Sequence, residues 1–553
     1  MKPFVRSILL IIAVSVSAFA QRAHPNRPTE TGGPLMPEQA AFDVQAYDVS
    51  VNANPVTRSI KGTTVMTARV VNPTDVIVLH LDTPYTVERI WTGKGEGQTT
   101  LRFDREEGRL RIHFPQTLRK GDTFETIISY AGTPRVAPNP PWVGGFIWTR
   151  TPSGADWISI AMQNDGADIL FPVKDHPSDK ADIATMRVTV PDPLVAVGPG
   201  KLEETVKNAD GTSTYVWKMT NPVPNYSILF DAAPYRLIKD TTKSVTGETI
   251  PIEFYILPES YDKGAKLIAE TKKYNAFFEK YLGPFPWRSQ KLGIVETPHL
   301  GMEHSTHIAY GNKFNFSPEG FDWLMFHEFG HEWWANLVTA RDWKDFWIHE
   351  GFQSFMDTFY LEEMKGKQAY FDAMKGRAKQ TLNKQAVAPR EDSPAYKVYL
   401  LAPDYVQSNG DIYGKGAVVL HTLRYLIGDD AFFRALRKMA YPKKEMERYT
   451  DGRQQRLTDT DEFLRIAEQE SKMDLDWFFE LYLRQPKLPT LVTETAGNTT
   501  TLRWETPNNL PFPMPIDVVV DDKTQRVNMK NGRATVTGTN ITIDPNGWVL
   551  KNQ

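Results

Sequence analysis

A short stretch of this sequence has the residue types and the spacing for metal chemistry. His327-Glu328-Phe329-Gly330-His331 is an HExxH pattern. Residues four apart share one face of a helix, so the imidazoles of His327 and His331 can reach one ion. Glu328 lies one position further around the helix, where its carboxylate reaches a water at the metal rather than the metal itself. The pattern predicts a hydrolytic metal site with Glu328 as general base.

The residues around this pattern indicate that the helix is buried. Leu324, Met325 and Phe326 precede it, and Trp333 and Trp334 follow it. The alternative is a helix whose two histidines only pack or cap. Two buried imidazoles and a buried carboxylate need compensation, however, and a bound metal supplies it.

A third protein ligand is expected on the next helix. Eighteen residues separate His331 from Glu350, which begins the stretch Glu350-Gly351-Phe352. A helix–loop–helix of that length can return a second helical face to the ion. Catalytic zinc commonly takes two His and one Glu with an open position for water. We therefore expect one zinc ion on these residues, although neighbouring transition metals accept the same ligand types.

The composition limits the other classes of function. The chain has 553 residues, 41% of them hydrophobic, which is typical of a globular protein with several domains. It has no cysteine, so disulfides, thiolate catalysis, iron–sulfur clusters and Cys-based zinc sites are excluded. Its 64 basic and 67 acidic residues give a net charge of −3. So balanced a chain has no electrostatic signature of nucleic-acid binding, and we expect no such partner.

The elements that must position the site fall into three parts. Apolar residues alternate with polar ones from about Phe42 to Lys239, which predicts a β-rich N-terminal domain over 42–245. Helical periodicity follows, for example over 265–281, 431–441 and 459–471, with a strand at 292–295, and predicts an α+β catalytic domain over 246–489. Strand patterns and a hairpin turn at Asn531-Gly532 predict a small C-terminal β domain over 490–553.

The first 41 residues are predicted to be a signal peptide followed by a linker. Lys2 and Arg6 precede an apolar run from Ile8 to Phe19, and Ala18-Phe19-Ala20 is a signal-peptidase pattern. The run of about 12 residues is shorter than the ~20 that a spanning helix needs, which disfavours a membrane anchor. We expect a signal peptide at 1–20, a proline-rich linker at 21–41, export to the periplasm or the medium, and no integral membrane association after cleavage.

The zinc motif and its spacing to Glu350 resemble the gluzincin aminopeptidases of the aminopeptidase N and leukotriene hydrolase family, whose catalytic domain is thermolysin-like. Leu300-Gly301-Met302-Glu303-His304 is similar to the family's Gly-x-Met-Glu-Asn strand. The resemblance implies that Gly301, Met302 and Glu303 bind substrate, with Glu303 at the free amine. Leu300 and His304 depart from the family pattern.

Two further stretches extend the resemblance. Tyr413-Gly414-Lys415-Gly416 resembles the family's Tyr-x-Lys-Gly, whose tyrosine donates a hydrogen bond to the developing oxyanion. Gln163 resembles the family residue that shares the substrate amine. Together these residues imply a zinc aminopeptidase acting on peptides with a free N-terminus. The resemblance is looser in the β-rich domain, and about 60 strand-like residues stand where many members have a long helical domain.

Three other functions are consistent with parts of the pattern. A thermolysin-type endopeptidase uses the same zinc ligands but has no amine-binding residues. An epoxide hydrolase resembling leukotriene hydrolase is possible in principle, although nothing in the sequence points to a lipid pocket. A catalytically silent peptide-binding relative is expected to lose a zinc ligand, Glu328 or Tyr413, and all of these are present.

Overall fold

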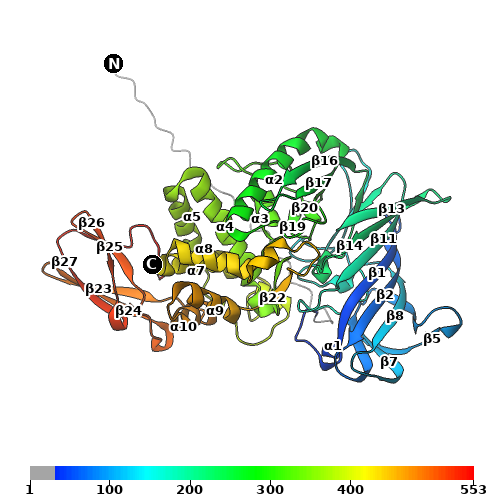
Figure 1. Ribbon diagram of the computed structural model, residues 1–553, viewed down its shortest axis with the longest axis horizontal. Coiled ribbons are helices and arrows are strands. Elements are labelled where there is room, and N and C mark those ends of the chain that lie inside the picture. The colour runs from blue at the N-terminus through cyan, green and yellow to red at the C-terminus, as the bar shows by residue number, and fades with distance from the viewer. Residues whose placement is uncertain (1–30, 553) are drawn as a thin grey trace, which may run out of the picture.

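The structure is a computed structural model in which residues 31–552 are described. Three parts follow one another along its long axis, from the β-rich N-terminal domain in blue and cyan, through a mixed central domain in green and yellow, to a C-terminal β part in orange and red (Figure 1). The signal peptide predicted at 1–20 lies outside the described residues. Within the described range, no helix has the length and apolar character needed to cross a membrane.

An eight-stranded sheet forms the body of the N-terminal domain, in the order β13-β14-β11-β1-β2-β8-β4-β5. Its strands are β1 (Phe42–Asn54), β2 (Ser59–Val70), β4 (Tyr85–Thr92), β5 (Thr99–Thr100), β8 (Thr123–Gly132), β11 (Ile183–Pro191), β13 (Lys201–Lys207) and β14 (Thr212–Met219). The predicted alternation is confirmed on β2, where Met66, Ala68 and Val70 are buried and their neighbours are less so. Such alternation lets one face of a strand pack on the core.

Two smaller sheets complete this domain. One has the order β3-β7-β6 and the other β12-β15-β10-β9. Their strands are β3 (Thr74–His80), β6 (Arg102–Glu106), β7 (Arg109–Leu118), β9 (Gly145–Arg150), β10 (Asp156–Ala161), β12 (Val195–Val197) and β15 (Asp231–Ala233). The second sheet matters for the site, because the chain leaves β10 directly before Gln163.

The segment before β1 differs from the tether expected there. Pro37–Ala40 forms the short helix α1, and Gln39 is buried beside His80. Glu38 pairs with Arg111, and the Thr31 hydroxyl donates to Asp175. These polar anchors hold residues 31–41 against the domain, and proline content alone did not reveal them.

The central domain is built on a five-stranded sheet in the order β16-β17-β18-β20-β19. Its strands are β16 (Arg236–Lys243), β17 (Thr249–Ile256), β18 (Leu292–Glu296), β19 (Gly301–Met302) and β20 (Ile308–Tyr310). The strands β17, β18 and β20 run parallel, whereas β19 pairs antiparallel with β20 at the edge. Because β16 belongs to this sheet, the central domain begins before the predicted boundary at 246. The alternating pattern continues from one domain into the next and cannot mark the border.

Helices pack on this sheet and around the site. They are α2 (Tyr261–Leu282), α3 (Trp323–Gly330), α4 (Trp347–Lys365), α5 (Lys367–Lys379), α6 (Ala395–Tyr399), α7 (Gly414–Ile427), α8 (Asp429–Ala440), α9 (Thr460–Ser471) and α10 (Asp476–Phe479). An aromatic cluster joins α2, α3 and α4: the Phe326 ring stacks on Tyr360 at 4.4 Å, and Phe277 packs edge-on against Tyr360 at 4.9 Å. Such pairs add to the burial energy and fix how the three helices lie.

Two short parallel strands, β21 (Val338–Ala340) and β22 (Arg456–Thr458), connect the loop after α3 to the segment before α9. The C-terminal part has two three-stranded sheets. Their strands are β23 (Thr490–Ala496), β24 (Thr499–Glu505), β25 (Ile516–Val520), β26 (Lys523–Val527), β27 (Arg533–Thr537) and β28 (Ile541–Ile543). The turn at Asn531-Gly532 joins β26 to β27, which lie in different sheets, so the predicted hairpin there is wrong.

Candidate metal centre

The helix α3 positions both histidines of the HExxH pattern. Asp322 begins the helix, and its side chain accepts a hydrogen bond of 3.0 Å from the Met325 amide, which satisfies one of the free amides at the helix start. His327 lies in the last turn, and His331 caps the helix with a helical φ of −65°. The two side chains therefore keep the spacing of one helical turn, and their Nε2 atoms lie 3.2 Å apart.

Each imidazole is fixed through its other nitrogen. Nδ1 of His327 lies 2.8 Å from Oδ2 of Asp357, and Nδ1 of His331 lies 2.7 Å from the carbonyl oxygen of Trp334. Both partners are acceptors, so each Nδ1 carries the proton and donates it. Each Nε2 is then left with a free lone pair, which is the arrangement of a metal-binding histidine.

Glu350 completes the set from the first turn of α4. Its Oε2 lies 3.5 Å from the Nε2 of each histidine. This oxygen is buried and has no hydrogen-bond partner among the described residues. Burial opposes the charge of Glu350, but His331 and His327 lower its pKa below the usual range. Three electron-pair donors therefore converge on one point.

The distances fit a small tetrahedral cation. Ligand atoms about 2.0–2.1 Å from a tetrahedral ion lie about 3.3 Å from one another. The three separations here are 3.2, 3.5 and 3.5 Å. Among the described residues, these three form the one His/Cys/Asp/Glu group whose ligand atoms lie close enough to hold an ion.

Two glycines bring Tyr413 to this centre. A side chain at Gly351 of α4 would meet Gly416 of α7 at 3.1 Å, and one at Gly416 would meet Gly351 at 2.9 Å. The backbones of α4 and α7 therefore touch where Glu350 and Tyr413 lie. Burial and the nearby charge of Glu350 raise the pKa of Tyr413 well above its usual value, so its hydroxyl stays protonated and can donate.

Glu303 lies at another wall of the site, held by donors from both domains. The Gln163 side-chain amide donates to its Oε1, and the Tyr226 hydroxyl donates to the same oxygen at 2.8 Å. Asn336 Nδ2 donates to the Glu303 carbonyl oxygen at 2.9 Å. The Glu303 side chain is 3% exposed, so it is not the exposed residue of an ordinary edge strand. Burial raises its pKa.

The edge strand β19 lies directly against Glu328. A Cβ at Gly301 would come within 2.8 Å of the Glu328 carboxylate and 2.9 Å of Leu324. A side chain at position 301 would therefore displace the ends of Glu328 and Leu324. Met302 follows Gly301, and because β19 is the last strand of its sheet, one side of its backbone is free to pair with an extended ligand.

The two departures from the family strand have different surroundings. Leu300 lines the site cavity. His304 is fully buried, with its ring centre 6.4 Å from that of Tyr226 and 6.2 Å from that of His307. Burial, with the neighbouring His307 and His299, lowers the pKa of His304 well below its usual value.

A single cavity of about 270 Å³ brings all the predicted site residues together. Those residues are Gln163, Gly301, Met302, Glu303, His327, Glu328, His331, Glu350 and Tyr413. Trp142, Trp323, Asp357, Arg377 and Tyr399 also line the cavity and were not predicted. Trp142, Arg377 and Tyr399 come from segments without a recognisable motif. Asp357 lies seven residues after Glu350, on the same face of α4, and this spacing was the signal that could have found it.

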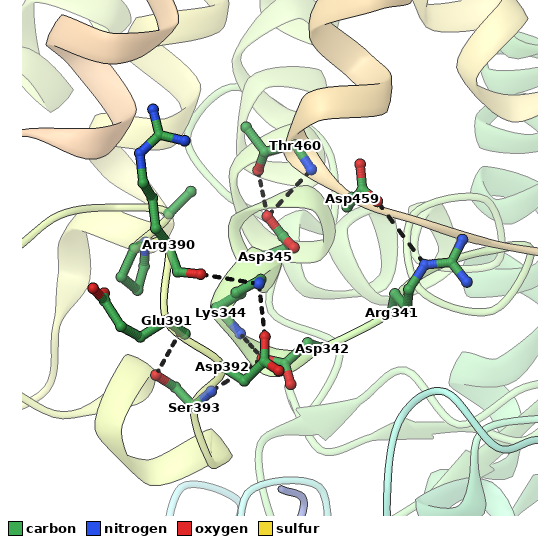
Figure 2. A network of polar contacts seen from close by, with 12 residues as sticks. Arg341, Asp342, Lys344, Asp345, Arg390, Glu391, Asp392, Ser393, Asp459 and Thr460 are labelled. Carbon is green, nitrogen blue, oxygen red and sulfur yellow. Dashed lines mark hydrogen bonds and ion pairs between the residues drawn. The ribbon is translucent and has the colours of Figure 1, made fainter. Parts of the chain in front are cut away.

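A second cavity, of about 480 Å³, lies beside the loop that leads into α4 and is lined by charged groups. Figure 2 shows that these groups bind one another: Lys344 Nζ lies 2.7 Å from Asp392 Oδ1, and Asp345 accepts two hydrogen bonds from Thr460. Trp347 also donates to Thr460 at 2.8 Å. The network therefore anchors the start of α4, which carries Glu350.

Two family models match the chain. The model described as Peptidase family M1 domain matches residues 269–482, and the Peptidase M1 N-terminal domain matches residues 44–227. The first match contains the HExxH helix, Glu350 and Tyr413, and the second contains Gln163 and Tyr226.

The individual relatives are 24–25% identical to the chain. The chain is 25% identical over 479 residues to endoplasmic reticulum aminopeptidase 1 of Homo sapiens, covering 81% of this chain and 49% of that protein. It is 24% identical over 415 residues to human aminopeptidase B, covering 68% and 59% of the two chains. The chain thus spans about half the length of the first of these relatives.

The solved structures support the same fold. A variant of the M1 zinc metallopeptidase from Deinococcus radiodurans, solved with a Tyr-Ser-Ala substrate, has a TM-score of 0.63 and 23% identity. The match covers 81% of this chain and 95% of that chain. At this identity the likeness shows the fold.

Proposed function

Because the chain belongs to peptidase family M1, we propose that it is a zinc aminopeptidase that removes the N-terminal residue from peptides. The observation that carries this proposal is that Glu303 and the three ligands His327, His331 and Glu350 line one cavity. A buried carboxylate beside the reacting centre fits an enzyme that selects for the substrate's free amine.

His327, His331 and Glu350 would hold one zinc ion, because two bare imidazole nitrogens and an unpartnered carboxylate oxygen converge at tetrahedral spacing. When bound, zinc supplies Lewis-acid chemistry by polarising the scissile carbonyl and making a neighbouring water more acidic. The lack of cysteine in the chain is consistent with this nitrogen and oxygen ligand set.

The remaining steps are carried by the chain's own side chains. Glu328 takes a proton from the attacking water and passes it to the leaving amine. Tyr413 donates a hydrogen bond to the carbonyl oxygen as negative charge develops on it, a contact worth roughly 3–4 kcal/mol. Both residues line the cavity with the metal ligands.

The carboxylate of Glu303 binds the substrate's ammonium group. Its side-chain hydrogen bonds come from the neutral groups of Gln163 and Tyr226, and no Lys or Arg among the described residues pairs with it. A buried carboxylate whose protein donors are neutral favours a cationic ligand, and a charge-assisted hydrogen bond to ammonium supplies one. Fixing the ammonium there fixes the cut after the first residue.

The test compares a peptide with a free N-terminus, its N-acetylated twin and a metal-free preparation. We expect hydrolysis of the free peptide, at least tenfold slower hydrolysis of the acetylated twin, loss of activity on chelation and recovery with zinc. Equal cleavage of the two peptides, or cleavage inside the chain, would replace this proposal with an endopeptidase. Zinc binding without any turnover would identify a catalytically silent relative.

We also propose that the protein is exported. The support is the basic start, the apolar run and the Ala18-Phe19-Ala20 pattern of the first 20 residues. N-terminal sequencing of the protein recovered from a periplasmic fraction should begin at Gln21. A cytoplasmic protein that keeps its first 20 residues would contradict export.

A further inference from the structure

The active-site cavity contains a guanidinium group that the reaction described above does not use. Arg377 of α5 lines the same cavity as Glu303 and the metal ligands. Its Nε donates to Thr358 Oγ1 at 2.8 Å, which holds the side chain in place. Within residues 31–552, no hydrogen bond is found from its terminal nitrogens, and Nη2 lies 3.8 Å from Asp357.

Asp357 forms only a long ion pair with Arg377, 3.8 Å from its Nη2. Its Oδ2 is the acceptor for His327 Nδ1 at 2.8 Å, and its Oδ1 accepts from Gln353 at 2.9 Å. The Arg377 side chain is 31% exposed and forms part of the cavity wall. Terminal N–H donors without a hydrogen bond among the described residues therefore belong to the wall of the cavity in which Glu303 is proposed to bind the ammonium of a peptide.

The order of contacts along the cavity places Arg377 away from the amine-binding end. Glu303 is held by Gln163 and Tyr226 and lines the cavity together with His331. His331 adjoins His327, His327 binds Asp357, and Asp357 neighbours Arg377. To meet Arg377, a peptide with its ammonium at Glu303 and its first carbonyl at the metal ligands would have to continue past those ligands.

We propose that Arg377 binds the C-terminal carboxylate of short substrates, so that the protein acts preferentially on peptides of two or three residues. The inference rests on the proposed aminopeptidase function and adds a substrate class to it. A carboxylate at one end and a guanidinium at the other match the two charges of a free short peptide. Guanidinium binds a carboxylate through two parallel hydrogen bonds.

The size of the cavity supports the same class. Its volume of about 270 Å³ is slightly below the range of small-molecule sites, which span roughly 300–1,000 Å³. Each extended residue advances the chain by only ~3.3–3.6 Å, so two or three residues suffice to cross a site of this size.

The experiment compares Leu-Gly with its C-terminal amide on wild type and on Arg377→Gln, Arg377→Lys and Lys379→Gln. We expect wild type to prefer the free carboxylate by roughly 10- to 150-fold in kcat/KM, mainly through KM, as for a hydrogen bond to a charged group. Arg377→Gln should bring the ratio close to one, and Arg377→Lys should give an intermediate ratio. Lys379 is exposed on the same helix, and its variant should keep the wild-type ratio.

Two results would overturn the inference. One is a wild-type ratio near one, and the other is an equal loss on both substrates in Arg377→Gln, which would mean that Arg377 acts through Asp357 and His327. Zinc content and thermal unfolding are measured for each variant to detect misfolding. If a variant fails to fold, the ratio of the wild-type kcat/KM values on Leu-Gly and its amide still tests whether the carboxylate is recognised. Leucine naphthylamide, which has no carboxylate, separates the two proposals: if wild type does not cleave it, the aminopeptidase function itself fails.

Discussion

Gln163 donates a hydrogen bond to Glu303, although 140 residues separate them in the chain. Gln163 follows β10 of the N-terminal domain, whereas Glu303 follows β19 of the central sheet. The end of the cavity proposed to bind the substrate amine is therefore built at the contact between two domains. Its geometry depends on how these domains pack, and the metal ligands come from α3 and α4 alone.

Other polar contacts hold this domain contact in place. His307 of the central domain lies 2.7 Å from Asp231 of β15, and both are fully buried. The Gly200 amide donates to Thr306 Oγ1 at 2.8 Å. Buried hydrogen bonds are costly to leave unmade, so they favour one relative position of the domains. The distance between Gln163 and Glu303 is thereby fixed before substrate arrives.

Gly301→Ala tests the contact between the edge strand and the general base. The added Cβ would lie 2.8 Å from the Glu328 carboxylate and 2.9 Å from Leu324, so both side-chain ends must move. Displacing a catalytic group by about 1 Å costs up to ~100-fold, so kcat should fall roughly 10- to 100-fold. Zinc content and melting temperature should barely change, because flexible side-chain ends yield easily.

Gly97→Ala is the matched control for that variant, since a Cβ at Gly97 meets nothing within 4 Å. Unchanged kcat in Gly301→Ala would show that the Glu328 carboxylate tolerates this displacement.

Asp357→Asn tests the support of a metal ligand. Asp357 accepts the proton of His327 Nδ1 at 2.8 Å and so directs Nε2 toward the ion. An amide is a weaker acceptor, and loss of such a partner typically costs 10- to 100-fold in metal affinity. Titration with a competing chelator measures the change. Asp372→Asn, on the exposed side of α5, should bind zinc like wild type; equal affinity in both variants would exclude this role of Asp357.

The sequence predicted the metal site better than its surroundings for a physical reason. His327 and His331 are fixed by the period of one helix, and Glu350 follows after a short loop, so local rules suffice. Tyr226 reaches Glu303, and Arg377 reaches the cavity, only through tertiary packing. Their positions depend on how elements far apart in the chain pack together. No spacing between residues in a single sequence indicates that packing.

The same reasoning applies to the fold. Alternation identified β2 because that strand has one buried face. It could not place the border at β16, because strands of neighbouring domains share the same period. The turn at Asn531-Gly532 was found, but whether the flanking strands pair with each other is decided by packing of the two C-terminal sheets.

Glu328→Gln tests the general base. Glu328 lies outside the three-ligand group, so the variant should retain zinc. The amide cannot accept the water's proton, and turnover should fall at least ~100-fold. Metal analysis beside steady-state kinetics checks both points. Near-normal turnover with zinc in place would mean that the proton follows another route.

Asp345→Asn tests a buried carboxyl in the network of Figure 2. Burial raises the pKa of Asp345 to about 6, against the hydrogen bonds from Thr460 and the charge of Arg484. In the unfolded chain the pKa is about 3.9. The folded state therefore holds this proton to higher pH than the unfolded chain, and the contribution of Asp345 to stability falls as pH rises from about 4 to 6.

Asparagine keeps an acceptor oxygen for Thr460 but carries no charge at any pH. The melting temperature of the variant, minus that of wild type, should therefore increase between pH 4 and pH 6 and level off above it. Melting curves of both proteins across that range measure the difference. A difference that does not change with pH would show that Asp345 has the same pKa folded and unfolded.

A double-mutant cycle on Gln163 and Glu303 tests whether the amine-binding end works as one unit. Glu303→Gln removes the charge that faces the ammonium, and should cost roughly 10- to 200-fold in kcat/KM on substrates with a free N-terminus. Gln163→Ala removes a neutral donor that holds Glu303, so its effect should be smaller.

Residues in direct contact are not expected to act additively. Because Gln163 acts largely through Glu303, the double variant should be little worse than Glu303→Gln alone. Zinc content should stay constant throughout, since both residues lie outside the ligand group. If the two losses simply multiply, Gln163 contacts the substrate independently, and the domain contact would not position Glu303.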